Sequence, residues 1–214
     1  MLRFATTTCL LPTASLLLSA CLLLTALPAA AGCVTAADLA TGVAFGRTDG
    51  HKGRVIAKDG GVFVDYAYGA PVWSDNRQTK LGIYELETTH FYEEEPGSVG
   101  GGSTDTAQSF RGKPPLPVAG QGWTGIVKAH TRQNNSSEFG GYDFDERFKV
   151  SYVFLTEKTV KLSGCSYKVI PVEASFVAQD STYTRRWLYF RDLGFGLETR
   201  QNGADFGLTS LKPA

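Results

Sequence analysis

Three histidines, His51, His90 and His130, are the side chains of this chain best suited to acid–base chemistry near neutral pH. They lie far apart in the sequence, so a metal or catalytic cluster requires the fold to bring at least two of them together. The acidic group from Asp143 to Glu146 could add carboxylates, because hard cations prefer several oxygen ligands. That stretch lacks the glycine and the terminal acid of a calcium-binding EF-hand loop, so solvated strand-end charges are the simpler interpretation.

Sequence signatures of the common catalytic sites are absent. There is no Gly-x-Ser-x-Gly elbow, no Walker loop, no HExxH motif and no complete Gly-x-Gly-x-x-Gly motif. We therefore expect no catalytic residue, no metal site and no bound cofactor, and we favour a non-enzymatic protein. The alternative is a hydrolase whose site is assembled from scattered residues such as His90, His130 and the acids from Asp143 to Glu146.

Aromatic and arginine side chains are concentrated near the C-terminus. Alternate side chains of a strand share one face, and on a strand over 183–191 one face carries Tyr183, Arg185, Trp187, Tyr189 and Arg191. Such a face could stack a sugar or an acyl headgroup. A cross-strand ladder, which stabilises a sheet without any ligand, is the interpretation that we favour.

The first 31 residues have the features of a secretory signal peptide. Arg3 supplies a positive charge, the run from Leu16 to Leu27 is apolar, and small residues follow it up to Ala31. The apolar run is too short for a lone membrane span, which needs roughly 20 residues. We therefore expect a mature chain of residues 32–214 that is periplasmic or secreted and has no membrane span after cleavage.

Two cysteines, Cys33 and Cys165, remain in that mature chain. An even number of cysteines in an oxidising compartment predicts a disulfide, which here would tie the N-terminus to a late strand. A buried free thiol at Cys165 is the alternative. A lipoprotein anchored through Cys33 or Cys21 also stays open, because the residues before each resemble a lipobox, and a lipid on Cys33 would exclude the disulfide.

The charge balance of the mature chain is close to neutral. The full chain carries 21 Lys and Arg against 21 Asp and Glu. Removal of residues 1–31 takes away only Arg3 and leaves a net charge of −1. Net charge therefore indicates no nucleic acid or other polyanion as a partner.

The elements that must position these residues are almost all strands. Thr35 to Gly42 predicts one short N-terminal helix, with Thr35 as its cap, Asp38 three residues later and Gly42 at its end. The later segments predict about ten strands joined by hairpin turns such as Asp59-Gly60 and Asn202-Gly203. This pattern is typical of an all-β, single-domain antiparallel β-barrel, half-barrel or sandwich.

Three details of this reading concern connections. Lys80 to Glu94 is expected to be one continuous strand. Residues 96–122 are rich in Gly and Pro and are expected to be a loop within the 32–214 domain. Glu157-Lys158 is expected to be a tight turn between two neighbouring strands.

Three stretches, Cys33 to Gly42, Leu162 to Glu173 and Leu188 to Glu198, carry a resemblance. They resemble uncharacterised exported proteins of alphaproteobacteria, and the last two are also similar to periplasmic half-barrels of the lipoprotein-carrier type. The resemblance implies a Gram-negative envelope and a curved antiparallel sheet, and it brings no catalytic residues. We therefore expect an exported non-enzymatic envelope protein, structural or ligand-binding. Its partner would be another envelope component or a small apolar or saccharide ligand.

Overall fold

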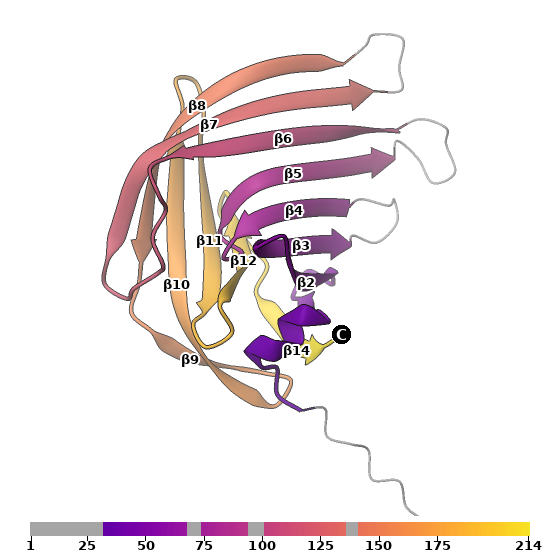
Figure 1. Cartoon of the computed structure of the whole chain (residues 1–214), viewed down its shortest axis with the longest axis vertical. Coiled ribbons are helices and arrows are strands. Elements are labelled where there is room, and N and C mark those ends of the chain that lie inside the picture. Colours follow the sequence, from indigo (N-terminus) through magenta and orange to yellow (C-terminus); the bar gives the residue numbers. More distant parts are fainter. Residues whose placement is uncertain (1–31, 68–73, 94–100, 136–140) are drawn as a thin grey trace, which may run out of the picture. The chain divides into compact units, whose positions relative to one another are not determined.

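A computed structural model gives the structure of the chain and describes residues 32–67, 74–93, 101–135 and 141–214. The signal peptide expected over residues 1–31 lies outside this part. From Gly32 onward the described residues form one compact unit. Its elements are a short 3-10 helix, η1, and fourteen strands (Figure 1): η1 Ala36–Ala40, β1 Val43–Arg47, β2 Lys52–Lys58, β3 Gly61–Ala67, β4 Ser74–Lys80, β5 Tyr84–Glu93, β6 Gly101–Arg111, β7 Gly122–Asn135, β8 Tyr142–Phe154, β9 Lys158–Leu162, β10 Cys165–Val177, β11 Thr182–Phe190, β12 Phe195–Gln201, β13 Ala204–Asp205 and β14 Leu208–Pro213.

All fourteen strands belong to one antiparallel sheet. The all-β antiparallel fold class predicted from the sequence is therefore confirmed. The strand order is β13-β12-β11-β10-β8-β7-β6-β5-β4-β3-β2-β1-β14, and β9 pairs with β10 beside this path. The sheet is not closed, and Figure 1 shows β7 and β8 bending strongly along their length. The bend brings β12 to the β4–β5 turn, where the Gly196 N–H donates to the Leu81 carbonyl over 2.8 Å.

The tight hairpins follow from residues that accept a positive φ. Asp59 and Gly60 have φ values of 51° and 74°, and Asn202 and Gly203 have 49° and 86°. Both central residues of a type I′ turn need a positive φ, so these two predicted turns are confirmed. Leu81 and Gly82 also have positive φ. The sequence does not predict this turn, because leucine rarely adopts a positive φ.

Three expectations from the sequence are corrected by the structure. They concern the strand over Lys80 to Glu94, the loop over 96–122 and the turn at Glu157-Lys158. The expected continuous strand over Lys80 to Glu94 is divided by the turn at Leu81 and Gly82, and β4 before it was not predicted. Gly101–Arg111 forms β6, so only part of the 96–122 segment can be a loop. Glu157-Lys158 does not join a hairpin, because β8 and β9 both pair with β10. Strands β4 and β6 are therefore two of the strands beyond the ten or so that the sequence predicts.

The predicted N-terminal helix is present as the 3-10 turn η1. The Thr35 N–H donates to Asp38 Oδ2 over 2.7 Å, and the Thr35 hydroxyl lies 2.8 Å from the same oxygen. Gly42 follows with a φ of 113°, a conformation that glycine adopts without strain. Cap and terminator are therefore the residues that the sequence indicates.

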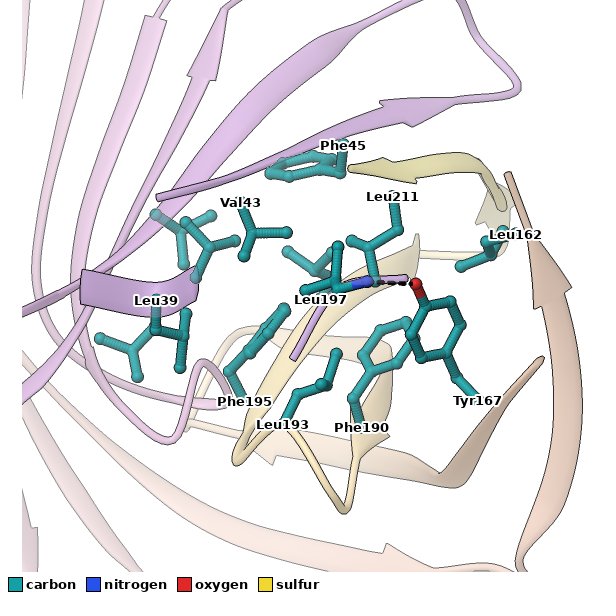
Figure 2. Packing of buried hydrophobic residues seen from close by; sticks show 14 of the residues in the cluster. Leu39, Val43, Phe45, Leu162, Tyr167, Phe190, Leu193, Phe195, Leu197 and Leu211 are labelled. Carbon is teal, nitrogen blue, oxygen red and sulfur yellow. Dashed lines mark hydrogen bonds between the residues drawn. The ribbon is translucent and has the colours of Figure 1, made fainter. Parts of the chain in front are cut away.

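Two clusters of buried side chains form the core, and on β11 they use opposite faces of the strand, with Phe190 in the first and Trp187 and Tyr189 in the second. Figure 2 shows the first, in which Leu39, Val43 and Phe45 from the N-terminal elements pack with Phe195 and Leu197 of β12. The second cluster joins β5, β7, β8, β10 and β11. Its largest side chains are aromatic and almost fully buried: Tyr84, Tyr152, Phe154 and Trp187.

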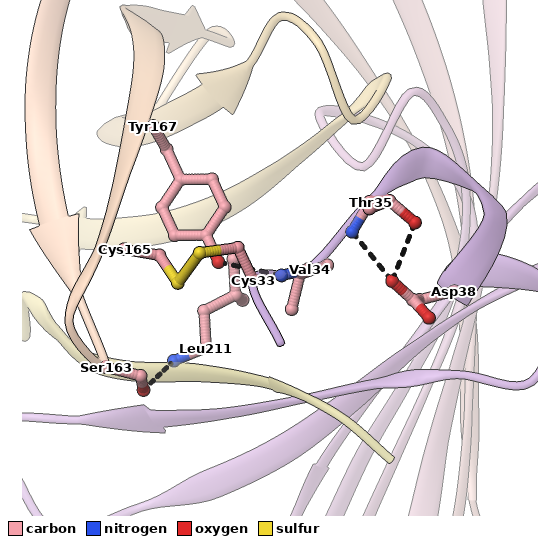
Figure 3. Close-up of a disulfide and its surroundings, with 8 residues drawn as sticks. All are labelled: Cys33, Val34, Thr35, Asp38, Ser163, Cys165, Tyr167 and Leu211. Carbon is pink, nitrogen blue, oxygen red and sulfur yellow. Dashed lines mark hydrogen bonds between the residues drawn. A yellow bond between two sulfur atoms is a disulfide. The ribbon is translucent and has the colours of Figure 1, made fainter. Parts of the chain in front are cut away.

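The predicted disulfide between Cys33 and Cys165 is confirmed. The two Cα atoms lie 5.6 Å apart and the residues are 132 positions apart in sequence. Figure 3 shows the Val34 N–H beside it, donating to the Tyr167 hydroxyl over 3.0 Å. This bridge and a thioether-linked lipid on Cys33 exclude each other.

Candidate functional site

A buried group of charged side chains connects four strands of the sheet. We call it the ion network: Asp75 and Arg77 of β4, Glu85 of β5, Arg185 of β11 and Glu198 of β12. Their side chains are 12% exposed or less, and that of Glu198 is 1% exposed. Because β4 and β12 are far apart in the strand order, the network joins parts of the sheet that backbone pairing does not.

Each arginine of the ion network is held by two or more carboxylates. Arg77 Nη1 donates to Glu85 Oε1 over 2.9 Å and to Glu198 Oε2 over 2.7 Å, and its Nη2 donates to Asp75 Oδ2 over 2.9 Å. Arg185 donates to Glu198 Oε1 over 2.5 Å and to both oxygens of Glu85 over 2.6 Å. Such charge-assisted bonds compensate the cost of burying these ions.

The electrostatics of the ion network favour the charged forms of Asp75, Glu85 and both arginines. Burial alone would raise the pKa of Glu85, but the Arg185 and Arg77 guanidiniums outweigh it and lower that pKa to about 2. Burial alone would likewise raise the pKa of Asp75, but Arg77 and His90 lower that pKa below its usual value. For both arginines burial favours the neutral form, yet the glutamates hold the pKa well above its usual value.

The aromatic and arginine face expected on 183–191 lies mostly inside the protein. Arg185, Trp187 and Tyr189 are buried, and the Arg185 guanidinium lies 4.8 Å from the centre of the Trp187 ring. Tyr183 stacks on Phe176 with ring centres 4.5 Å apart.

The fifth member of that face, Arg191, lies outside the core. Its Nη1 donates to Glu157 over 2.7 Å, and its side chain is 46% exposed. Four of the five side chains therefore pack against protein, and Arg191 forms surface ion pairs.

The fold does not gather the three histidines. His90 lies beside the ion network, where its Nδ1 contacts Asp75. His130 lies on the opposite face of the sheet, and His51 lies at the β1–β2 turn beside Asp49. Within the described residues no group of three or more His, Cys, Asp or Glu side chains is placed to hold a metal ion.

His130 does meet two of the acids named with it in the sequence. Its Nε2 lies 3.2 Å from Asp143 Oδ1 and its Nδ1 lies 3.0 Å from Asp145 Oδ1. The His130 side chain is 48% exposed and that of Asp145 is 87% exposed. Since both ring nitrogens contact carboxylates, neither is directed at a substrate in this arrangement.

The inner face of β8 changes character along the strand. Phe148, Val150, Tyr152 and Phe154 are buried, whereas two residues of the same alternation nearer the start of the strand, Tyr142 and Phe144, are 53% and 42% exposed. Their rings stack with centres 5.6 Å apart.

The pairing register places polar side chains beside these two rings. Gln133 pairs with Tyr142 and Thr131 pairs with Phe144, and the Gln133 amide donates to the Tyr92 hydroxyl over 3.3 Å. We call this surface the inner shelf: Tyr92, Thr104, Thr106, Thr131, Gln133, Tyr142 and Phe144.

No match to this chain is found among family models, curated proteins or solved structures. The site must therefore be judged from its own geometry. In the part of the chain that the structure describes, no helix is long and apolar enough to cross a membrane.

Sequence reasoning missed the ion network and the inner shelf. Asp75, Arg77 and Thr79 alternate along β4 and are all buried. This alternation with a period of two could have indicated the buried face of β4. It consists of polar residues, however, and strand prediction relies on the alternation of apolar residues. Tyr142 and Phe144 alternate with Asp143 and Asp145 in the same way. The sequence prediction considered only the acids of this segment as candidate site residues.

Proposed function

We propose that this chain is an exported, non-enzymatic envelope protein that binds a saccharide-bearing component at the inner shelf. The observation that carries the proposal is the stacked pair Tyr142 and Phe144, which is exposed near the start of β8 on the face that is buried from Phe148 to Phe154. Aromatic rings offer a flat apolar surface of the kind on which sugar rings pack.

The polar part of the inner shelf supports the same ligand class. The Thr106 and Thr131 hydroxyls lie 3.1 Å apart on adjacent strands, and Gln133 and Tyr92 add an amide and a phenol. Hydroxyl and amide groups both donate and accept hydrogen bonds, as sugar hydroxyls require. Two ionisable side chains border the shelf on the same face: His90, which contacts Asp75, and Glu146, which accepts a hydrogen bond from the Ser181 hydroxyl.

The packing of the interior argues against an acyl carrier. Trp187, Tyr152, Phe154, Phe190 and Phe195 are each 2% exposed or less and occupy the volume that an apolar ligand would need. The ion network occupies the space between β4 and β12. A ligand would therefore bind on a surface of this protein.

The first experiment measures binding to the inner shelf. The full chain is titrated calorimetrically with soluble peptidoglycan fragments and with lipopolysaccharide core oligosaccharide. We expect one of the two probes to bind, and Phe144→Ser to weaken that binding at least tenfold, about 1.4 kcal/mol. Phe91→Ser is the matched control, because Phe91 is 44% exposed on the opposite face of β5. Equal losses in both variants, or no binding of either probe, would contradict the proposal.

A hydrolase is the second candidate, favoured by the contact of His90 Nδ1 with Asp75. A carboxylate in that position orients an imidazole for acid–base work. Hydrolysis of ester, glycoside and peptide substrates is assayed with the wild-type chain and with His90→Gln. Turnover that is lost in His90→Gln and kept in Phe144→Ser would replace the binding proposal by the enzymatic one.

Export and maturation are tested by intact mass spectrometry of the protein from its native host. We expect a chain that begins at Gly32, contains one disulfide and carries no lipid. A mass that includes residues 1–31, or a lipid at Cys21, would contradict periplasmic release.

A further inference from the structure

The outer face of β6, β7 and β8 carries four basic side chains at adjacent register positions. We call them the cationic patch: Arg111, Lys128, Arg147 and Lys149. Lys128 pairs directly with Arg147, and Ile126 lies between Arg111 and Lys149 on the next row. Neighbouring strands are about 4.8 Å apart, so the four positions lie within roughly 10 Å. All four residues are exposed.

The cationic patch has no internal compensation in the described part of the chain. The acids of the same face are used elsewhere: Asp145 contacts His130, and Asp143 contacts both His130 and Arg132. The ion pairs among the described residues include none of the four patch residues.

The direct pairing of Lys128 with Arg147 has a cost. Like charges that face each other across adjacent strands destabilise a sheet. An anion bound between the two side chains would remove this repulsion and gain two charge-assisted hydrogen bonds. The facing of Lys128 and Arg147 is therefore unfavourable in the free protein and becomes favourable when an anion binds between them.

A surface hollow lies at the same place. It has a volume of about 580 Å³, and its polar lining includes Ser109, Lys128, His130 and Arg147 together with the acids Asp145 and Glu146. Volumes of this size hold small ligands. Ser109 pairs with Lys128 on the neighbouring strand, so its hydroxyl can add a hydrogen bond to an anion held by the two cations.

We propose that the cationic patch binds a compact soluble ligand that carries two adjacent phosphate groups. Lys128 and Arg147 would hold one phosphate in the hollow, and Arg111 and Lys149 would hold the second on the next row. The net charge of −1 for residues 32–214 gives no hint of such a site, because it sums the charges of the whole chain whatever their positions.

The acids beside the patch argue for a compact ligand and against a membrane. Asp145 and Asp143 lie one and two rows from Arg147 on the same strand face, and Asp145 is 87% exposed. An extended anionic surface that reached the patch would also meet these carboxylates. A diphosphate group in the hollow meets Asp145 and Glu146, which line it, but not Asp143, so it meets fewer carboxylates than an extended surface would.

The test uses inorganic pyrophosphate and inorganic phosphate as probes, titrated calorimetrically into the full chain at low and physiological salt. We expect pyrophosphate to bind at least tenfold more tightly than phosphate and its affinity to fall with salt. Lys128→Gln and Arg147→Gln should each weaken pyrophosphate at least tenfold. Arg132→Gln, on the same face of β7 but paired with Asp143, is the control and should leave binding unchanged.

Thermal unfolding keeps the test independent of activity and reports folding of each variant. Pyrophosphate should raise the melting temperature of the wild-type chain and of Phe144→Ser, and leave that of Arg147→Gln unchanged. Survival of binding in Phe144→Ser separates this site from the inner shelf.

Three results would overturn the proposal. The first is equal binding of phosphate and pyrophosphate, and the second is an equal loss in Arg132→Gln. The third is patch-dependent sedimentation with phosphatidylglycerol vesicles in the absence of pyrophosphate binding, which would identify a membrane surface as the occupant instead.

Discussion

Replacement of Arg185 by methionine tests whether the ion network holds the fold together. Arg185 bridges Glu85 and Glu198, and its side chain is 6% exposed. Without it, the carboxylates of Asp75, Glu85 and Glu198 are left with Arg77 as the one guanidinium of the network. The two remaining glutamates must then either stay charged without full compensation or take up protons.

The magnitude follows from the burial of these groups. Breaking a buried ion pair by removing one partner costs about 3–5 kcal/mol, because a charge is left buried without its partner. A domain of this kind is stable by about 5–15 kcal/mol in total. Arg185→Met should therefore remove a large fraction of the free energy of unfolding.

Arg186→Met provides a matched control on the next residue of β11. Arg186 faces the other side of the sheet and pairs with Glu173, and the two side chains are 33% and 42% exposed. Ion pairs at the surface contribute about 0–1 kcal/mol. The same substitution on the two faces of one strand should thus differ by several kcal/mol.

The assay is urea unfolding followed by tryptophan fluorescence under oxidising conditions. With a slope of about 2 kcal/mol per molar urea, Arg185→Met should lower the midpoint by about 2 M and Arg186→Met by less than about 0.5 M. The double variant Arg185→Met/Glu198→Met should be more stable than Arg185→Met, because it removes an uncompensated carboxylate. If the two single variants have equal midpoints, the reasoning about the ion network is wrong.

Three further predictions concern the disulfide, the acid limit of stability and a turn. Removal of the bridge in Cys33→Ser/Cys165→Ser should lower the free energy of unfolding by about 5 kcal/mol, the chain-entropy value for a loop of this length; urea unfolding of the oxidised and reduced wild-type chain is the check. Burial would raise the pKa of Glu85, but the two arginines outweigh it and lower this pKa from 4.5 to about 2. The contribution of the ionised Glu85 to stability is therefore complete above pH 4.5 and is lost as the pH falls toward 2. Unfolding measured from pH 7 to pH 2 should show this loss, and Glu85→Gln should show less of it. Gly82→Ala should destabilise far more than Gly203→Ala, because both have positive φ but only the Gly82 side chain would meet backbone, 2.2 Å away; thermal unfolding compares them, and equal melting temperatures would contradict the close approach of the β4–β5 turn to β12.

The parts of the fold that the sequence predicts are those decided by neighbouring residues. The Asp59-Gly60 and Asn202-Gly203 turns need only two residues that accept a positive φ. The cap of η1 needs only Thr35 and Asp38. The disulfide was predictable because the expected removal of residues 1–31 leaves only Cys33 and Cys165.

The parts that the sequence hides depend on partners far along the chain. Strand β4 has no large apolar side chain, and its buried Arg77 is compensated by Glu198, 121 residues away. Strand β6 reads as a loop because Gly and Thr replace the usual apolar alternation, and its place is set by pairing with β5 and β7. The cationic patch likewise arises only when three strands align, since no two of its residues are adjacent in sequence.

The pairing of β1 with β14 joins segments from opposite ends of the described chain. Strand β1 has β2 on one side and β14 on the other, and Val43 pairs with Pro213. The Ala214 N–H donates to the Gly42 carbonyl over 2.9 Å, which extends this contact to the end of η1. Because contacts between segments so distant in sequence form slowly, we expect the β1–β14 pairing to form late in folding, after the hairpins that join neighbouring strands.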